Sequence, residues 1–252
     1  MTPPNDPVAI ITGAGRGIGR AFALRFARDG YRVVVADLNL KSAQSVCAEI
    51  AAAGGTAHAM RTDVSAEADA RACVATTVER WKRVDVLINN AAHFADIERR
   101  PFWEVEAAEW DRVLAVNARG TWLMMKAAAA PMRERLRGSI INMSSNTFLS
   151  GVPGFAHYIA SKGAIVGLTR TAARDLGEYN VRVNCILPGL TRTEVVRASD
   201  EAGRYEQLVR SQSIKRVETP EDLVGTAAFL ASDDSAFMTG AALTVDGGNS
   251  FH

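Results

Sequence analysis

The chain has 252 residues, a formal net charge of +1 at pH 7 and 48% hydrophobic residues. This length allows one large α/β domain or two small ones, with ample residues for a core. Charges that nearly cancel give no global field that would recruit nucleic acid or an acidic membrane. Cysteines and histidines are scattered without metal-ligand spacing, so we expect buried, reduced thiols and no metal site. Residues 1–7 do not resemble a signal peptide and no apolar run approaches ~18 residues, which predicts a soluble cytoplasmic protein without a membrane span.

Short β-branched runs alternate with longer helical patterns along the whole chain. The expected strands are residues 8–12, 33–37, 57–62, 84–89, 139–144, 181–187 and 241–245. The expected helices run from Ile18 to Gly30, over residues 42–53, 66–81, 107–117, 121–136 and 158–176, and from the Thr219-Pro220 start. Several strands are apolar on both faces, which is typical of parallel central strands. The alternation predicts an α/β fold: a doubly wound parallel sheet with helices on both faces.

No linker or change of composition divides the chain, so we expect a single domain over residues 1–252. Within it we expect a cofactor half at about 7–145 and a catalytic and substrate half at about 146–252. Residues 190–218 carry charge, no strand pattern and only a weak helical pattern. A segment of this kind in a compact domain predicts a lid, and a plain surface insertion is the alternative.

A glycine-rich turn joins the first expected strand to the first expected helix. Gly13, Gly17 and Gly19 follow the spacing G-x-x-x-G-x-G. Glycine permits a tight turn, lets the backbone approach a pyrophosphate and leaves helix N–H groups facing the anion. The strand before it and the helix after it are the context that favours dinucleotide binding. We therefore expect Gly13, Arg16, Gly17, Ile18 and Gly19 to contact the cofactor.

Two acidic residues at strand ends bear on the choice of cofactor. Asp37 ends the second strand, where a carboxylate accepts hydrogen bonds from the adenosine ribose and repels a 2′-phosphate. Arg16 acts in the opposite sense because it could pair with that phosphate. We give Asp37 more weight, which predicts NAD rather than NADP. Asp63, at the end of the third strand, is expected either to bind the adenine or to cap the next helix.

Lys162 follows Tyr158 by four positions in an expected helix, and Ser145 lies thirteen positions before Tyr158. Positions i and i+4 share one helix face, so the ammonium can lie near the phenol. A nearby cation lowers a tyrosine pKa, and a phenol tuned in this way acts as a general acid or base. The spacing alone is common by chance, and a helix with one buried ring and one solvated charge is the alternative.

With these residues together, the chain resembles the classical short-chain dehydrogenase/reductases over essentially its whole length. The matches are residues 12–19, Asp63, residues 89–91, Asn117, Ser145, Tyr158 with Lys162, and residues 188–189. The resemblance implies a Rossmann-type seven-stranded sheet and a catalytic group of four. Tyr158 would be the general acid/base and Ser145 would hold the substrate oxygen. Lys162 would bind the nicotinamide ribose and lower the tyrosine pKa, and Asn117 would hold a water in a proton relay.

The resemblance also implies further cofactor contacts, from Val64, Asn90, Ala91, Pro188, Gly189 and Thr191. The chain departs from the family pattern at Ala92, where a glycine is usual, so the shape of the loop after it, His93-Phe94, is in doubt. Ser144 and Ser145 point to opposite faces of a strand. The family spacing favours Ser145, which leaves Ser144 structural or in contact with the cofactor.

The expected substrate pocket is mostly apolar. Its candidate residues are Phe94, Asn146, Phe148, Leu149, Phe155, Leu190 and Val195. They favour a hydrophobic, aromatic or cyclic secondary alcohol and its ketone, although several could simply be packed beneath the lid. Residues 145–148 and 229–234 resemble the branch that contains 1-phenylethanol dehydrogenase and pyridoxal 4-dehydrogenase. His157 is expected to begin a helix rather than to touch substrate.

Two other functions remain open from the sequence. An NADPH-dependent 3-oxoacyl reductase would share the fold and catalytic group, although Asp37 opposes its cofactor. A cofactor-binding regulator without catalysis would not need the intact catalytic group. Helices over residues 126–131 and 163–171 are rich in small residues, and in the resembling family the matching helices form subunit contacts, which predicts a homotetramer.

Overall fold

The computed structural model describes residues 6–198 and 203–251, so residues 199–202 of the predicted lid lie outside the described part. Seven parallel strands form one sheet in the order β3-β2-β1-β4-β5-β6-β7. The strands are β1 (Val8–Thr12), β2 (Arg32–Asp37), β3 (Thr56–Arg61), β4 (Val86–Asn89), β5 (Gly138–Met143), β6 (Val181–Pro188) and β7 (Ala242–Val245). The predicted doubly wound α/β fold is confirmed, and strand ends agree with the sequence pattern to within about two residues.

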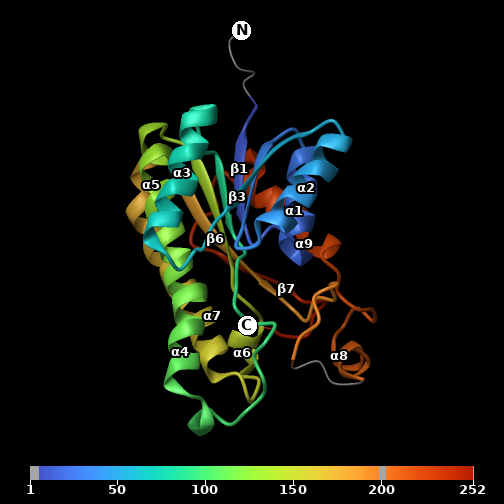
Figure 1. Ribbon diagram of the computed structural model, residues 1–252. Helices are drawn as coiled ribbons and strands as arrows, with labels where there is room; N and C mark the ends of the chain where they lie inside the picture. The colour runs from blue at the N-terminus through green and yellow to red at the C-terminus, as the bar shows by residue number, and fades with distance from the viewer. Residues whose placement is uncertain (1–5, 199–202, 252) are drawn as a thin grey trace.

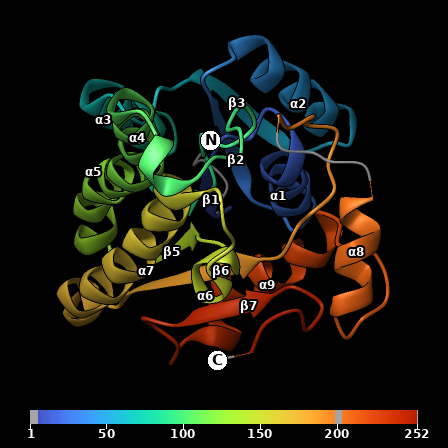
Figure 2. The same cartoon turned by 90° about the horizontal axis from the view of Figure 1, so that it is seen from below.

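Helices cover both faces of the sheet (Figures 1 and 2). One layer contains α1 (Gly17–Arg28), α2 (Leu40–Ala52) and α9 (Glu221–Ala231). The other contains α3 (Glu67–Trp81), α5 (Gly120–Glu134) and α7 (Ala156–Leu176). Short helices outside these two layers include η1 (Phe102–Glu104), α6 (Thr147–Ser150), η3 (Gly177–Tyr179), α8 (Arg204–Ser211) and η4 (Asp233–Ser235).

Alternation along the strands produces a separate apolar core on each face. In β1, Ile10 faces the layer of α3, α5 and α7, whereas Ile11 faces the layer of α1, α2 and α9. Phe22 and Phe26, one turn apart on α1, fill the second core and are almost fully buried. Because successive strand side chains point to opposite faces, a strand covered on both sides must be apolar throughout.

The helical segment before β5 differs from the two helices expected there. α4 (Ala107–Leu114) continues through η2 (Ala115–Arg119), a π-helical turn, directly into α5. The predicted break between residues 117 and 121 is wrong, because the chain stays helical there and only widens to a π-helical turn. Such π-helical turns are frequent at functional sites, and this one contains the buried Asn117.

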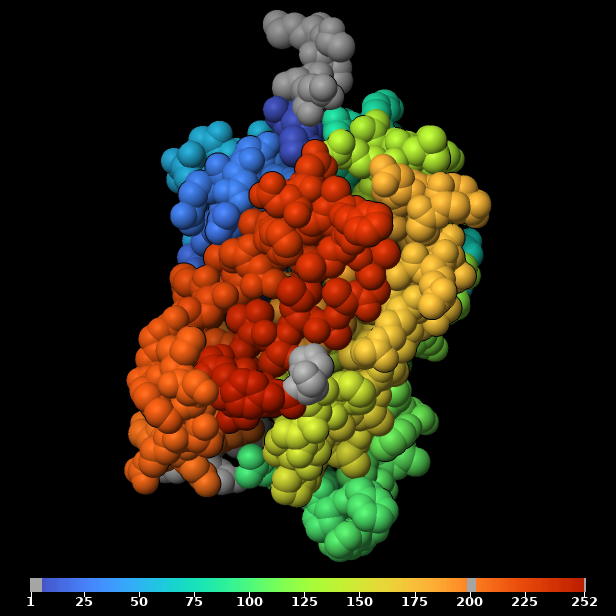
Figure 3. Space-filling view, turned by 180° about the vertical axis from the view of Figure 1, so that it is seen from behind, coloured from blue at the N-terminus to red at the C-terminus, as the bar shows by residue number. Residues whose placement is uncertain are grey.

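The carboxyl ends of the strands point to the lower end of the molecule in Figure 1, where α6 and α8 lie. The space-filling view shows α8, in orange, and the start of α4, in green, projecting at this end (Figure 3). In parallel α/β sheets, ligands bind outside the carboxyl ends of the strands. Within residues 6–198 and 203–251, no helix is both long and apolar enough to cross a bilayer.

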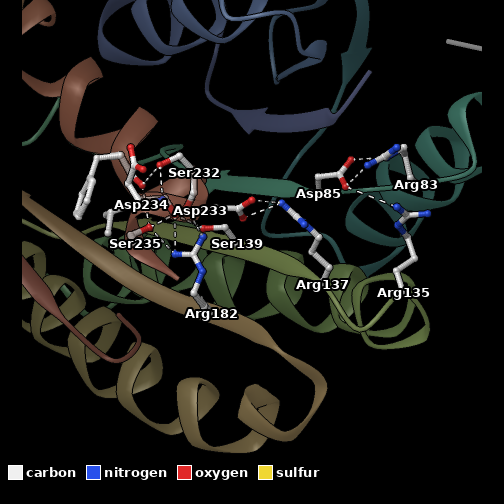
Figure 4. Close-up of polar contacts among 12 residues, drawn as sticks. Arg83, Asp85, Arg135, Arg137, Ser139, Arg182, Ser232, Asp233, Asp234 and Ser235 are labelled. Atoms are coloured by element: carbon white, nitrogen blue, oxygen red, sulfur yellow. Dashed lines mark hydrogen bonds and ion pairs between the residues drawn. The ribbon is translucent and has the colours of Figure 1, made fainter. Parts of the chain in front are cut away.

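A polar network lies at the opposite end of the sheet, near the amino ends of β4, β5 and β6 (Figure 4). Asp85 accepts hydrogen bonds from the Val8 backbone N–H at 2.8 Å and from Arg83 Nε at 2.7 Å. Arg182, on β6, donates to the carbonyl of Leu230 and the hydroxyl of Ser235, both at 2.8 Å. These bonds attach the end of α9 to the sheet, far along the strands from the edge where ligands bind.

Candidate active site

The predicted catalytic side chains come together at the carboxyl end of β5. Tyr158 and Lys162 lie one turn apart on α7, and Ser145 follows β5. Lys162 Nζ lies 5.4 Å from the centre of the Tyr158 ring and donates a hydrogen bond to the Met143 carbonyl at 2.8 Å. All three side chains are largely buried and border one cavity. The structure therefore joins residues from β5 and α7 into one polar cluster.

Burial dominates the acid–base properties of this cluster. It raises the pKa of Tyr158 to about 12, although a hydrogen bond with Ser145 and the positive charge of Arg197 lower it. Burial also lowers the pKa of Lys162 to about 8. Desolvation of the phenolate outweighs the effects of Ser145 and Arg197 in this structure, and the lowering of the tyrosine pKa by Lys162 stays a prediction. The Tyr158 phenol is therefore protonated near neutral pH.

Ser144 and Ser145 have different partners. Ser144 Oγ donates to the Lys162 carbonyl at 2.8 Å and so fixes α7 to the end of β5. Ser145 Oγ accepts a hydrogen bond from Thr147 Oγ1 at 2.9 Å, which leaves its own proton for the phenol or a substrate oxygen. Ser144 thus makes a structural bond and also lines the cavity, so both roles considered for it stay open. The role of Ser145 in holding a substrate oxygen stays a prediction.

Asn117 connects the loop after β4 to α7. Its Oδ1 accepts from the His93 backbone N–H at 2.7 Å, and its Nδ2 donates to Ser161 Oγ at 3.0 Å. Its backbone carbonyl accepts from Thr121 Oγ1 at 2.7 Å. The side chain is completely buried, so Asn117 positions the site in this structure; its part in a proton relay stays a prediction.

A second cavity, of about 410 Å³, lies beside the glycine turn. Of the residues predicted to contact the cofactor, those that line this cavity are Gly13, Arg16, Gly17, Ile18, Asp37, Asp63, Val64, Asn90 and Ala91. Gly13 and Gly17 have φ of +61° and +57°, and a Cβ at Gly13 would lie 2.8 Å from the Ala91 Cα. Glycine is therefore required for the turn to lie this close to the loop after β4.

The first turn of α1 already binds one anionic oxygen. The Gly17 N–H donates to Glu194 Oε1 at 2.8 Å, and this bond lowers the pKa of the Glu194 carboxyl. No acidic side chain of α1 lies in that turn, and Arg16 makes no side-chain capping bond. A turn that holds a carboxylate oxygen in this way has the donor geometry that a dinucleotide pyrophosphate needs. The residues present thus fit the cofactor that the glycine spacing predicts.

Asp37 and Asp63 both lie at the cavity and both also order the local backbone. Asp37 accepts from the backbone N–H of Gly15 at 2.8 Å and of Asn39 at 2.9 Å. Asp63 accepts from the backbone N–H of Ser65 at 2.9 Å and from its hydroxyl. A carboxylate has about four acceptor positions, so each can also bind a ligand hydroxyl or amine. Asp63 does not cap α3, because the N-cap residue of that helix is Ala66. It stabilises the turn that precedes the helix instead.

The cavity that the catalytic cluster borders has a volume of about 440 Å³, and only some of the predicted pocket residues line it. Phe94, Asn146 and Leu190 line it, together with Pro188, Gly189 and Thr191. Phe148, Leu149, Phe155 and Val195 do not.

The pocket candidates outside this cavity occupy other parts of the fold. Phe148 lies against Gly163 of α7, and Leu149 packs with Val166 and Leu187. Phe155 is buried beneath Phe94, at 5.7 Å between ring centres, and Val195 lines the cofactor-side cavity. His157, the second residue of α7, contacts Glu109 of α4 at 3.2 Å, in keeping with its expected place at a helix start.

Several charged residues at the site were missed from the sequence. Arg99, Arg197 and Arg204 line the substrate-side cavity. Glu218 is buried behind the β6 loop and accepts from Thr191 Oγ1 at 2.7 Å and from the Gly189 N–H at 3.1 Å. The only sequence signal for Arg197, Arg204 and Glu218 was the charge of residues 190–218, which does not say which side chains point inward. No sequence pattern singled out Arg99.

Known proteins are similar to this chain in sequence and in fold. A family model described as Enoyl-(Acyl carrier protein) reductase matches residues 13–250. Short-chain reductase protein NovJ of Streptomyces niveus is 39% identical, with 96% of this chain and 94% of that protein covered. Sorbitol dehydrogenase of Cereibacter sphaeroides is 38% identical, with 96% of both chains covered.

A solved structure has the same fold. The 3-ketoacyl-(acyl-carrier-protein) reductase from Brucella melitensis, complexed with NADH, superposes with a TM-score of 0.88 at 34% identity, covering 97% of this chain and 98% of that one. With the fold, the glycine turn and the Ser–Tyr–Lys cluster already in place, the chain belongs to the classical short-chain dehydrogenase/reductase family of oxidoreductases. The finer resemblance to the branch that contains 1-phenylethanol dehydrogenase and pyridoxal 4-dehydrogenase stays a prediction.

Proposed function

We propose that the protein is an NAD(H)-dependent oxidoreductase that interconverts a secondary alcohol, with a hydrophobic aromatic or cyclic body, and its ketone. The observation that carries the proposal is the cluster of Ser145, Tyr158 and Lys162 in a cavity next to the glycine turn. The bound cofactor would supply the hydride carrier, and the protein supplies position and a proton. The Pro188-Gly189 loop and Thr191 would hold the nicotinamide end, since they line the same cavity.

The proposed proton route starts at the Tyr158 phenol. Ser145 holds the substrate oxygen, and the protonated phenol donates to that oxygen when a ketone is reduced. In the oxidative direction the same oxygen atom accepts the alcohol proton. Lys162, with a pKa near 8, then stabilises the phenolate by its charge while the tyrosine is ionised. Asn117 holds the loop after β4 in place relative to α7, beside the cluster.

The choice of NAD rests on Asp37. Its carboxylate lines the cofactor-side cavity, where it would accept from the ribose hydroxyls and repel a 2′-phosphate. The solved relative from Brucella melitensis was crystallised with NADH, which agrees with this choice. Sorbitol dehydrogenase of Cereibacter sphaeroides is a named alcohol dehydrogenase in the same family.

The test is an initial-rate comparison of NADH and NADPH with a panel of aryl, cyclic and acyl ketones. We expect turnover with NADH, a marked preference over NADPH, and loss of turnover in Tyr158→Phe with NADH binding retained. Tyr179→Phe is the matched control, because Tyr179 lies on η3 and its hydroxyl contacts Arg133. Activity of Tyr158→Phe close to that of the wild type would refute the mechanism.

An NADPH-dependent 3-oxoacyl reductase is the second candidate, favoured by the 3-ketoacyl reductase among the solved relatives. A strong preference for NADPH with acyl thioester substrates would select it. Tight NAD binding without turnover of any ketone or alcohol would instead favour a regulator that lacks catalysis.

We further propose a cytoplasmic homotetramer. Exposed aromatic side chains support it: Trp110 on α4 and Trp122 on α5 are 40% and 43% exposed, and Phe237 before β7 is fully exposed. Isolated apolar side chains are normal on a surface, but several bulky ones on neighbouring helices suit subunit contacts. Light scattering that gives a monomer mass would overturn the proposal.

A further inference from the structure

Glu218 binds the loop after β6 at three points. Its Oε1 accepts a hydrogen bond from Thr191 Oγ1 at 2.7 Å, and its Oε2 accepts one from the Gly189 N–H at 3.1 Å. Its backbone carbonyl accepts from the Arg192 N–H at 2.8 Å. A Cβ at Gly189 would lie 2.6 Å from Oε2, so the carboxyl group lies directly against the backbone of this loop. One buried residue therefore fixes both the backbone and a hydroxyl of the loop.

The hydroxyl of Thr191 is the polar group that this residue can offer to a ligand. Gly189 and Thr191 line the same cavity as Tyr158. The Thr191 N–H donates to the Gly189 carbonyl at 3.1 Å, and the Thr191 carbonyl accepts from Arg197 Nη2 at 2.7 Å. A hydroxyl has one proton and two lone pairs. Because the proton is donated to Glu218, the lone pairs are what the hydroxyl can present to a ligand.

The charge of Glu218 decides whether the Thr191 hydroxyl can also donate. Burial raises the pKa of Glu218 to about 7. When it is ionised, its Oε1 accepts the threonine proton. When it is neutral, Oε2 still faces the Gly189 N–H, so the acid proton belongs on Oε1 and is donated to the threonine oxygen. The threonine proton is then released for another acceptor.

Charged groups approach Glu218 from four segments. Arg216, two residues before it, donates to Asp222 of α9 at 2.6 Å, and this bond lowers the pKa of Asp222 to about 2. Burial acts to raise the pKa of Asp246, after β7, but the hydrogen bonds of that carboxyl lower it. On the loop, the Arg192 guanidinium lies 4.5 Å from the centre of an aromatic ring of α8. Of the three carboxyl groups, Glu218 is therefore the one that changes charge near neutral pH.

We propose that Glu218 is a positioning residue for the nicotinamide end of the cofactor, because it makes the Thr191 hydroxyl an acceptor for the carboxamide nitrogen. The proposal rests on the proposed oxidoreductase function. A carboxamide has an N–H₂ donor at one end and a carbonyl acceptor at the other. While Glu218 is ionised, Thr191 can only accept, so only the N–H₂ end is complementary to it. When Glu218 is neutral, the released threonine proton can bind the carbonyl instead, and the two ends are no longer distinguished.

The test compares NAD with 3-acetylpyridine adenine dinucleotide. In this analogue a methyl ketone replaces the carboxamide, so the N–H donor is lost and the carbonyl is kept. The readout is the ratio of the dissociation constant of the analogue to that of NAD. It is measured by calorimetric titration without substrate at about pH 6 and at about pH 8.5, on either side of the Glu218 pKa. A titration that affects both dinucleotides equally cancels in this ratio.

In the wild type we expect the ratio to be about threefold to tenfold larger at the higher pH, the usual effect of one hydrogen bond. In Glu218→Gln the amide oxygen must face the Gly189 N–H, because two donors repel, so the amide nitrogen donates to Thr191 as the neutral acid does. This variant should show the smaller ratio at both pH values. Glu221→Gln is the matched control, since Glu221 is exposed at the start of α9 and lines neither cavity. It should follow the wild type.

Substitutions at Thr191 test the same bond without changing Glu218. Thr191→Val removes the hydroxyl and should abolish the pH dependence of the ratio. Thr191→Ser keeps the hydroxyl and should retain that dependence. A purely structural role for Glu218 would weaken both dinucleotides together and leave the ratio unchanged in every variant.

Three results would overturn the proposal. A wild-type ratio that is equal at both pH values, with both dinucleotides bound, would overturn it and leave the oxidoreductase function intact. A pH-dependent ratio that persists in Glu218→Gln would assign the dependence to another group. Failure of NAD and its analogue to bind at either pH would overturn the cofactor assignment and this proposal with it.

Discussion

Glu218 offers a test of how burial at the cofactor loop affects stability. Its side chain is 7% exposed and its two oxygens accept from Thr191 Oγ1 and the Gly189 N–H. Burial raises the pKa of this carboxyl from 4.5 to about 7, against the effect of those two hydrogen bonds. We expect Glu218→Gln to remove the resulting pH dependence, since glutamine has almost the same shape and does not ionise.

The sign follows from proton binding. Between about pH 4.5 and pH 7 the folded state keeps the Glu218 proton that the unfolded chain releases, so stability falls as pH rises and levels off above pH 7. Each pKa unit corresponds to about 1.4 kcal/mol, so this group should remove up to about 2.5 kcal/mol of stability between about pH 5 and pH 8. The variant should therefore gain that amount relative to the wild type over the same interval.

The assay is urea unfolding of both proteins at several pH values and one fixed protein concentration, because subunit association changes apparent stability. Glu206→Gln is the control, since Glu206 is exposed on α8. It should follow the wild-type curve at every pH. A constant stability difference between Glu218→Gln and the wild type across the range would refute the reasoning.

Three further substitutions test other contacts. Glu194→Gln removes a negative charge from the Gly17 N–H, so we expect the NAD dissociation constant from fluorescence titration to fall about twofold to fivefold; unchanged or weaker binding would contradict this. Asp37→Asn keeps an acceptor for the Gly15 N–H and removes the charge, so the ratio of kcat/KM for NADP to that for NAD should rise about tenfold, and a constant ratio would show that Asp37 does not select the cofactor. Arg182→Met removes the donors to Leu230 and Ser235, which should lower the free energy of unfolding by about 2–3 kcal/mol in urea; equal stability would rule out a stabilising role for this network.

Most of the fold can be predicted from the sequence, because apolar residues recur along the strands and helices with clear periods. β1 is buried at every position and apolar from Val8 to Ile11, and α1 places Phe22 and Phe26 one turn apart, so their types and approximate ends could be predicted. The π-helical turn η2 could not, because its residues suit an ordinary α-helix equally well. Asn117, in this turn, bonds to His93 and Ser161, which are distant in sequence, and no local pattern specifies such contacts.

The candidate site divides in a similar way. Tyr158 and Lys162 lie at a fixed spacing on α7 and Ser145 follows β5 directly, and the structure brings them together. The substrate wall comes from loops, where hydrophobicity does not separate a pocket residue from a core residue. Phe155 is buried in the core beneath the cavity, and Phe148, on α6, packs against Gly163 of α7. Arg197 and Arg204 reach the cavity through long side chains, which no sequence pattern placed there.

The two bonds between Lys162 and the end of β5 have a consequence for how new specificities can arise. Lys162 donates to Met143, and its carbonyl accepts from Ser144, so helix and strand are joined at the point of chemistry. The facing wall includes Arg99, from the loop after β4, and Arg204, at the start of α8, and neither segment shares these bonds. Exchange of those segments between relatives should therefore transfer substrate preference while the proton-transfer apparatus is inherited unchanged, which makes this wall the natural unit for grafting and for directed evolution.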